Sequence, residues 1–142
     1  MRHEGHYNKI TQELVDDISY GIIGCAIDVH KELGPGLLES IYEECMKIEM
    51  RNLKIKFESQ VPINVIYKGV ELNKNYFADL IVEDLVVVEL KTVDKILPIH
   101  EAQLLTYLKL FKKPKGIIIN FKTENISKSL KSMVSEYYEK IR

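Results

Sequence analysis

The sequence predicts an α/β protein in which helices flank a mixed sheet. Three observations indicate this class. Apolar residues recur every three to four positions across residues 10–51, which is typical of amphipathic helices. Across residues 61–91 they alternate with polar residues or form short β-branched runs, which is typical of strands. Helical and extended patterns then alternate towards the C-terminus, so the predicted order is α-α-β-β-β-α-β-α.

Two helices are expected at the start of the chain. The first spans about Ile10 to Leu33, because steps of three and four residues place its apolar side chains on one stripe. The segment Gly34-Pro35-Gly36 ends this helix, since glycine suits a left-handed cap and proline cannot continue the hydrogen-bond ladder. A second helix is expected from about Leu37 to Arg51.

Three antiparallel strands joined by short loops are expected next. The first lies around residues 61–70, where apolar and polar residues alternate and Lys68-Gly69 indicates a turn. The other two span Tyr76–Val82 and Leu85–Lys91, with Glu83-Asp84 between them.

The last part of the chain is expected to add a helix, a strand and a helix. Pro98 opens a helix that extends to about Phe111. The apolar run over residues 116–121 predicts a strand that is buried on both faces. Apolar residues between Ile126 and Ile141 then predict a final helix with one apolar side.

Length and composition limit the class of protein. The chain has 142 residues, with 20 Lys and Arg against 21 Asp and Glu, which suits one soluble domain over residues 1–142. A net charge of −1 excludes a generally basic nucleic-acid coat. Two cysteines exclude a disulfide framework, and no apolar run approaches the ~20 residues of a membrane-spanning helix. Without a visible signal segment, we expect a cytoplasmic protein with no membrane association.

Two carboxylates interrupt strands that are otherwise apolar. Asp79 and Glu89 lie within the second and third predicted strands, where an unpaired buried carboxylate is costly. They are therefore either paired with Lys91 at a strand end or bound to a cation. A two-residue loop would send Glu89 to the opposite face from Asp79, whereas a three-residue loop would place the two side by side, with Lys91 on the same face. The cation hypothesis therefore requires the three-residue loop.

Asp79, followed ten residues later by Glu89-Leu90-Lys91, resembles the signature of the PD-(D/E)XK nuclease superfamily. Gly36, Glu39 and Tyr42 also match the motif that names the GxxExxY group within it. The resemblance covers about residues 10–135 and implies a restriction-endonuclease-like fold with an αβββαβ core. It departs from the superfamily name at Ala78, where that name has a proline.

The activity that the resemblance implies is Mg²⁺- or Mn²⁺-dependent hydrolysis of phosphodiester bonds, with DNA favoured over RNA. Asp79, Glu89 and the Leu90 carbonyl would hold one or two ions. Lys91 would orient or activate the attacking water and offset charge that develops on the phosphate.

Four more residues are candidates for the same site. Glu39 would be a further acid at the metal, although an acid in a first helical turn also favours the helix dipole by itself. Gln103 and Tyr107 have the Gln-x-x-x-Tyr spacing of RecB-like exonucleases, where this motif supports the active site and the nucleic acid. An ordinary amphipathic helix edge is the alternative for that pair. By the same resemblance His30 would ligate the metal, its alternative being a partly buried histidine at a helix edge.

Other functions stay open at this point. Near-neutral charge and small size also fit a catalytically silent nucleic-acid-binding or protein-interaction module that retains the nuclease fold. A homodimer that builds one DNA groove from two copies is a further alternative. The lysines that gather after the expected site would contact a phosphate backbone or stay solvated: Lys109, Lys112, Lys113, Lys115, Lys122, Lys128 and Lys131.

Overall fold

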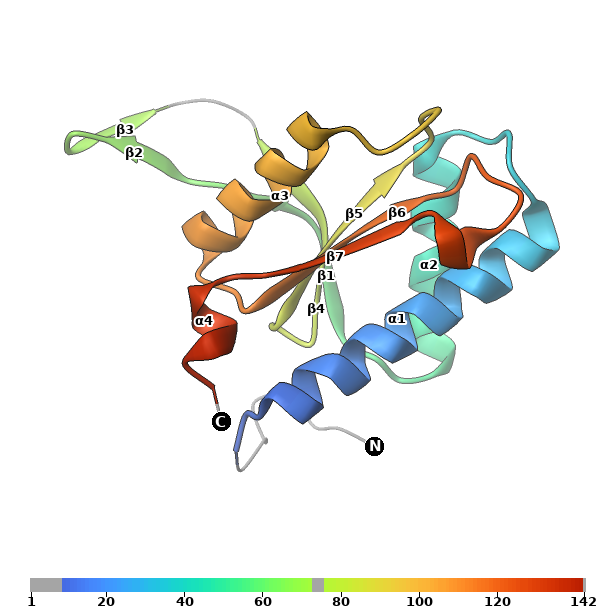
Figure 1. Ribbon diagram of the computed structural model, residues 1–142, viewed down its shortest axis with the longest axis horizontal. Coiled ribbons are helices and arrows are strands. Elements are labelled where there is room, and N and C mark those ends of the chain that lie inside the picture. Colours follow the sequence, from blue (N-terminus) through green and yellow to red (C-terminus); the bar gives the residue numbers. More distant parts are fainter. Residues whose placement is uncertain (1–8, 73–75, 142) are drawn as a thin grey trace.

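The computed structural model describes residues 9–72 and 76–141, and it has three layers, with helices on both faces of a central sheet (Figure 1). The elements are α1 (Gln12–Leu33), α2 (Glu39–Asn52), β1 (Phe57–Pro62), β2 (Val65–Tyr67), β3 (Val70–Leu72), β4 (Phe77–Val82), β5 (Val86–Lys91), α3 (Pro98–Phe111), β6 (Lys115–Asn120), η1 (Ile126–Lys128), β7 (Leu130–Val134) and α4 (Glu136–Glu139). The predicted class, an α/β protein with a mixed sheet between helices, is confirmed.

The central sheet has the strand order β1-β4-β5-β6-β7. Strands β5 and β6 pair in parallel and are joined through α3, whereas the other neighbours are antiparallel. Strands β2 and β3, which lie between β1 and β4 in the sequence, form a separate two-stranded sheet. We call this sheet the arm, and it projects from the body of the protein (Figure 1). The extended region predicted around residues 61–70 is therefore divided between the end of β1 and the arm.

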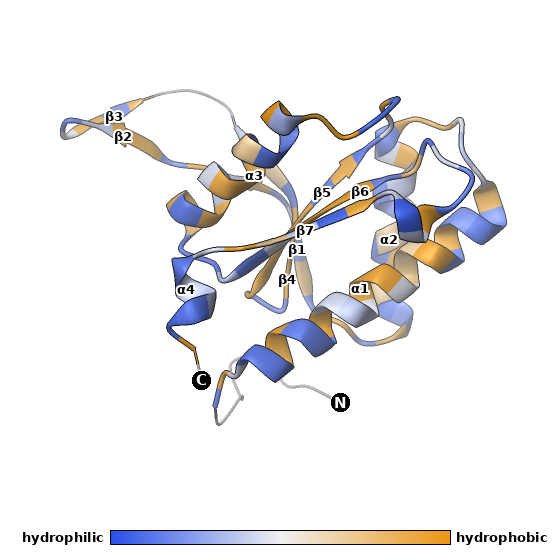
Figure 2. Cartoon of the chain, viewed as in Figure 1, coloured by the Kyte–Doolittle hydropathy of each residue, from blue (hydrophilic) through white to orange (hydrophobic). Residues whose placement is uncertain are grey.

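Apolar side chains fill the space on both faces of the sheet. Val15, Met46 and Leu90 belong to the core that α1 and α2 cover, and Val87 and Leu104 belong to the core beneath α3. Alternate residues of β6 enter the two cores, which confirms that this strand is buried on both faces. Figure 2 shows the result, since the strands are mostly hydrophobic while the helices are banded.

The prediction of one helix over residues 126–141 is wrong. This segment contains the short helix η1, the strand β7 and the single turn α4. Strand β7 pairs antiparallel with β6, so Leu130 packs against one core and Met133 against the other. The spacing of these apolar residues fits a helix equally well, but the open edge of β6 supplies backbone hydrogen bonds that a helix would leave unmade.

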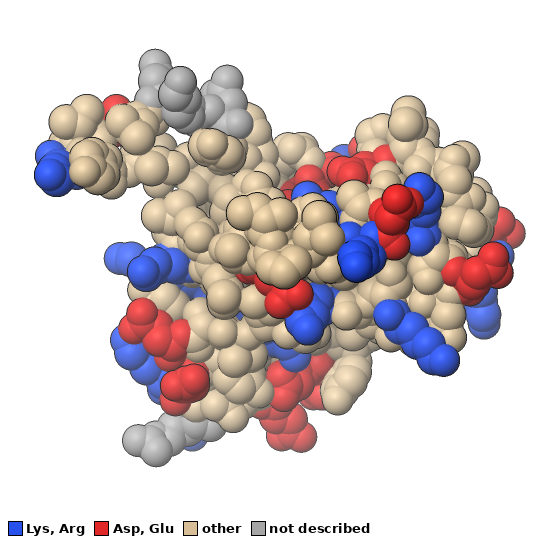
Figure 3. Space-filling view, turned by 45° about the horizontal axis from the view of Figure 1, so that its top comes forward, with Lys and Arg blue, Asp and Glu red and all other residues tan. Residues whose placement is uncertain are grey.

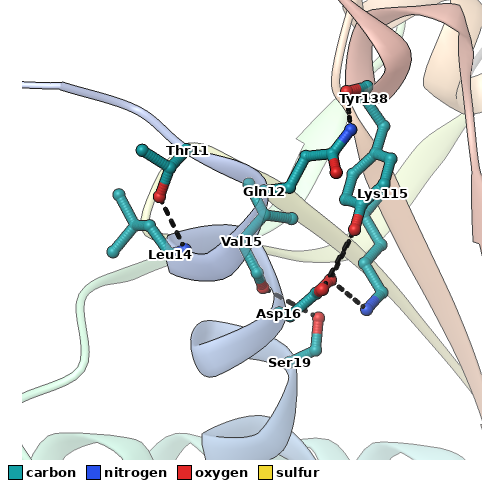
Figure 4. Close-up of polar contacts among 8 residues, drawn as sticks. All are labelled: Thr11, Gln12, Leu14, Val15, Asp16, Ser19, Lys115 and Tyr138. Carbon is teal, nitrogen blue, oxygen red and sulfur yellow. Dashed lines mark hydrogen bonds and ion pairs between the residues drawn. The ribbon is translucent and has the colours of Figure 1, made fainter. Parts of the chain in front are cut away.

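Polar contacts fasten the C-terminal segment to the start of α1 (Figure 4). Lys115 Nζ lies 3.0 Å from Asp16 Oδ1, and the Tyr138 hydroxyl donates to Asp16 Oδ2 at 3.0 Å. Gln12 Nε2 donates to the Tyr138 carbonyl at 3.0 Å, while the Thr11 hydroxyl caps α1. In the described residues no helix is long and apolar enough to cross a membrane.

Candidate active site

The loop between β4 and β5 has three residues, as the cation hypothesis requires. Val82 pairs with Val86 across it, and Glu83 and Asp84 hold positive φ angles of 51° and 59° to make the tight reversal. The register continues through Leu80 and Val88. One row further on, Asp79 and Glu89 face each other on the same side of the sheet.

At the row of Asp79 and Glu89, the main-chain N–H groups donate to side-chain carboxylates instead of to main-chain carbonyls. The Asp79 N–H donates to Glu89 Oε2 at 3.0 Å, and the Leu90 N–H donates to Asp79 Oδ2 at 2.8 Å. Each carboxylate is therefore held by the main chain of the neighbouring strand. In this crossed arrangement one oxygen of each carboxylate accepts a main-chain N–H. The second oxygen of each carboxylate is left to accept a hydrogen bond from another group.

The surroundings of Glu89 disfavour its charged form. The side chain is only 6% exposed, and burial together with the charge of Asp79 raises the pKa of Glu89 to about 8. The negative charge of Glu39 raises this pKa further, while the positive charge of Lys91 opposes the increase. Lys91 and Glu39 therefore lie within electrostatic reach of Glu89.

Oxygen donors of this kind suit Mg²⁺ or Mn²⁺, because hard divalent cations prefer carboxylate and carbonyl oxygens. A cation between Asp79 and Glu89 would also replace the proton that burial favours on Glu89. In the described part of the chain, no group of three or more His, Cys, Asp and Glu side chains is arranged to hold a metal ion. The two carboxylates of Asp79 and Glu89, which lie side by side on adjacent strands, match the donor type that such an ion prefers.

Two residues that the sequence reasoning missed join this row. Gln60 Nε2 donates to Asp79 Oδ1 at 3.2 Å and to Glu43 Oε1 at 2.7 Å. Gln60 lies on β1 opposite Asp79 and has a φ of 49°. Burial and the charge of Asp79 raise the pKa of Glu43. Glu43 follows Glu39 by one helical turn, a spacing that could have identified it, whereas the sequence offers no comparable signal for Gln60.

Helix α3 adds the predicted glutamine and tyrosine to the other side of the site. Gln103 Nε2 donates to the Tyr107 hydroxyl at 3.0 Å, and Tyr107 is only 6% exposed. Burial and the negative charge of Glu89 raise the pKa of Tyr107. Tyr107 therefore lies within electrostatic reach of Glu89, and Gln103 is bonded to Tyr107.

Comparison with known proteins gives this arrangement a family. The PD-(D/E)XK nuclease superfamily matches residues 16–133, which include every candidate site residue named above. The chain belongs to the PD-(D/E)XK nuclease superfamily. The nucleases of this superfamily generally use divalent metals such as Mg²⁺, in agreement with the donor atoms at Asp79 and Glu89.

Two further comparisons complete this result. No curated protein matches the chain. Among solved structures, a crystal structure described as that of SSO0001 is similar, with 22% identity and a TM-score of 0.48. The similarity covers 94% of this chain and 70% of the other.

Tyr42 has a structural role in this PD-(D/E)XK protein. Its hydroxyl donates to the Gly34 carbonyl at 2.5 Å and accepts from the Leu37 N–H at 3.2 Å, while its ring stacks on Phe121 with centroids 4.3 Å apart. These contacts hold the loop that precedes α2. The loop leads directly into α2, whose first residue is Glu39.

His30 joins the end of α1 to the loop after β6. Its Nε2 lies 2.7 Å from the Thr123 carbonyl, and a carbonyl oxygen can only accept a hydrogen bond. Nε2 therefore donates this hydrogen bond, which holds the end of α1 against the loop after β6.

Asn120 fixes the segment that follows β5. Its Oδ1 accepts from the Val93 N–H at 3.0 Å, and its Nδ2 donates to the Val93 carbonyl at 2.8 Å. Asn120 also pairs in register with Lys91. This buried amide therefore supports the strand end that carries the lysine.

Proposed function

We propose that this protein is a Mg²⁺- or Mn²⁺-dependent nuclease of the GxxExxY group, formed as one domain over residues 1–142, that hydrolyses phosphodiester bonds in DNA. The observation that carries the proposal is the crossed pair of hydrogen bonds between Asp79 and Glu89. These bonds hold two carboxylates in one row, next to Lys91. Two rigid strands thus pre-organise the acidic pair, which a catalytic metal site requires.

Asp79, Glu89 and the Leu90 carbonyl are the proposed ligands. A divalent ion bound there would lower the pKa of a coordinated water and offset negative charge on the phosphate. Glu43 is linked to Asp79 through Gln60, and the charge of Glu39 acts on Glu89; both would accept hydrogen bonds from water at the site. In this proposal His30 contributes through Nδ1 only, because Nε2 is bonded to Thr123.

Lys91 is the proposed group that acts on the substrate directly. It follows Glu89 by two residues on β5, so both side chains leave the same face of the strand. An ammonium group at this position would orient the attacking water and stabilise charge on the phosphate oxygens. The Gln103–Tyr107 pair would position water or substrate from the side of α3.

A catalytically silent nucleic-acid-binding module is the second candidate. Two features favour it: among the described residues no group of three His, Cys, Asp or Glu side chains is arranged to hold a metal, and burial beside Asp79 raises the pKa of Glu89, which disfavours its charged form. Such a protein would bind nucleic acid without hydrolysing it.

Nuclease assays with matched variants separate these candidates. Purified protein is incubated with Mg²⁺ or Mn²⁺ and with single-stranded DNA, duplex DNA and RNA. We expect Asp79→Asn and Lys91→Met to lower cleavage at least ~100-fold, because each removes a charge that acts in the reaction. Asp94→Asn is the control, since this exposed aspartate pairs with Lys122 at 2.7 Å.

The outcomes are distinct. Thermal unfolding of each variant shows whether it is folded, so that a loss of activity can be assigned to the site. Equal cleavage by wild type, Asp79→Asn and Lys91→Met would identify a contaminating nuclease and contradict the proposal. Nucleic-acid binding without cleavage under any metal condition would favour the silent module.

A further inference from the structure

A groove of about 250 Å³ lies beside the acidic site, between α3 and the base of the arm. Ile63, Val65 and Tyr76 line it from the arm side, and Gln103, Tyr107 and Leu110 line it from α3. The Ile63 N–H donates to the Tyr76 carbonyl at 2.9 Å, which joins the two ends of the arm at this wall. A main-chain hydrogen bond therefore holds one wall of the groove in place.

Tyr107 connects the groove to the acidic site. Its ring lines the groove, while the charges of Glu89 and Asp79 both raise the pKa of its hydroxyl. The Tyr76 hydroxyl adds to the same effect, so the two tyrosines lie within electrostatic reach of each other. A molecule bound at the carboxylates therefore has an adjoining pocket with an aromatic side chain from each wall.

The residues that line the groove indicate what kind of chemical group it would bind. It includes aliphatic side chains, two tyrosine rings and one amide, and none of the lining residues carries a charge at neutral pH. A phosphate would therefore find no counter-charge in the groove. A nucleobase suits it, because bases stack on aromatic rings and an amide can bond to their edges.

Charge on the rest of the molecule favours a single strand over a duplex. Four of the lysines expected to contact phosphates form ion pairs: Lys113 with Asp84 at 2.7 Å, Lys115 with Asp16 at 3.0 Å, Lys122 with Asp94 at 2.7 Å and Lys131 with Glu101 at 4.0 Å. Figure 3 shows basic and acidic side chains interspersed on the face it presents, with an arm that is mostly uncharged. A duplex is held mainly through phosphates, whereas a single strand also gains from stacking.

We propose that the groove binds an unstacked base of a single-stranded nucleic acid, next to the phosphodiester that lies at Asp79 and Glu89. This inference rests on the proposed nuclease function for the position of the phosphate. Bases in a duplex are stacked and paired, so they cannot enter the groove without being extruded. The natural substrate is therefore single-stranded, or carries an unpaired end or flap.

Binding measurements without hydrolysis test the groove. Fluorescence anisotropy in EDTA compares a single-stranded oligonucleotide, the same strand with one abasic position, and the duplex. The variant Tyr76→Ala removes one ring, and Leu110→Trp fills the groove while keeping both tyrosines. Tyr20→Ala is the matched control, because Tyr20 is a 72% exposed tyrosine on α1 and does not line the groove.

We expect Tyr76→Ala and Leu110→Trp each to weaken single-strand binding roughly 10-fold, the size of one stacked base. The abasic strand should bind wild type with the same deficit, and Tyr20→Ala should bind like wild type. Duplex binding at least as tight as single-strand binding, or equal binding by Tyr76→Ala and Tyr20→Ala, would overturn the inference.

Cleavage assays keep the two proposals separate. If wild type binds single strands in this base-dependent way but never cleaves them with Mg²⁺ or Mn²⁺, the nuclease function fails and the base site stands. If wild type cleaves DNA but Tyr76→Ala and Leu110→Trp bind and cleave single strands like the control, the base site fails and the nuclease function stands.

Discussion

Glu89 is the residue of the site whose surroundings affect its charge most strongly. It is buried on a central strand, faces a second carboxylate and accepts a hydrogen bond from the Asp79 N–H. The bond stabilises the ionised form of Glu89, but burial and the charge of Asp79 have the larger effect, so the pKa rises to about 8. In metal-free protein at neutral pH, Glu89 is therefore mostly protonated.

A pH series on metal-free protein tests this state. The folded pKa lies above the ordinary value of 4.5, so between these two values the folded state holds a proton that the unfolded state has lost. Glu89 therefore lowers the free energy of unfolding as pH rises from about 4.5 to about 8, by at most about 1.4 kcal/mol per pH unit. Glu89→Gln should remove this decline, because it cannot ionise.

Urea unfolding of both proteins in EDTA at pH 5 to 8.5 provides the measurement. The difference between Glu89→Gln and wild type isolates this group from all others that titrate in the range. We expect the difference to increase towards pH 8 in favour of the variant. Stability curves that stay parallel over the whole range would contradict the assignment.

The sequence predicts the acidic pair and its lysine because a polar residue within an apolar strand is conspicuous. Side-chain alternation then reduces the question to one loop length, and the observed three-residue loop supplies the answer. Gln60 could not be predicted in this way. Its role depends on β1 lying beside β4 and on a φ of 49°, neither of which follows from its sequence neighbours.

At the scale of elements, α3 lies close against β6. A Cβ built on Gly116 would lie 2.7 Å from Leu104 Cδ1, and Leu104 is fully buried. The helix that carries Gln103 and Tyr107 thus depends on a glycine in the strand beneath it. Any displacement of α3 would move that pair relative to the carboxylates.

Replacing this glycine tests the packing. Gly116→Ala should destabilise the protein by about 1–3 kcal/mol, because the added methyl overlaps a side chain that has no space to retreat. Gly24→Ala is the matched control, since a Cβ there meets no atom within 4 Å and alanine favours the interior of α1. It should stabilise the protein by up to about 1 kcal/mol.

Chemical denaturation of the two variants beside wild type measures both effects. Opposite shifts of the unfolding midpoint are expected. If Gly116→Ala were as stable as Gly24→Ala, the close approach of α3 and β6 would be wrong.

The C-terminal segment shows where sequence patterns stop being informative at this scale. Leu130 and Met133 are three residues apart, a spacing that predicts one side of a helix. In the structure they lie on opposite faces of β7. The deciding factor is the unpaired edge of β6, a long-range feature that a local period does not contain.

Across the whole molecule, the site lies where two helices, α2 and α3, approach one row of the strands β4 and β5. The strands supply Asp79 and Glu89, the start of α2 brings Glu39, and α3 brings Tyr107. The order of elements as far as β6, apart from the arm, and the acidic residues of this site were predictable because each carries a local signal. Their convergence was not, since it depends on the order of strands in the sheet.

The net charge of −1 is also clearer at this scale. It includes surface ion pairs, such as Lys113 with Asp84, and an acidic pair of which Glu89 is buried and Asp79 half-buried. The protein is therefore not prepared to attract a duplex by charge alone. For the proposed nuclease, selectivity would come from the acidic site and from the surfaces next to it.

A crystal structure of the protein soaked with Mn²⁺ tests the central claim most directly. Anomalous scattering from manganese locates the ion without reference to the protein chain. We predict a peak between Asp79 and Glu89, with carboxylate oxygens about 2.1 Å away. An anomalous map at saturating Mn²⁺ with no peak at these two carboxylates would contradict the proposed metal centre.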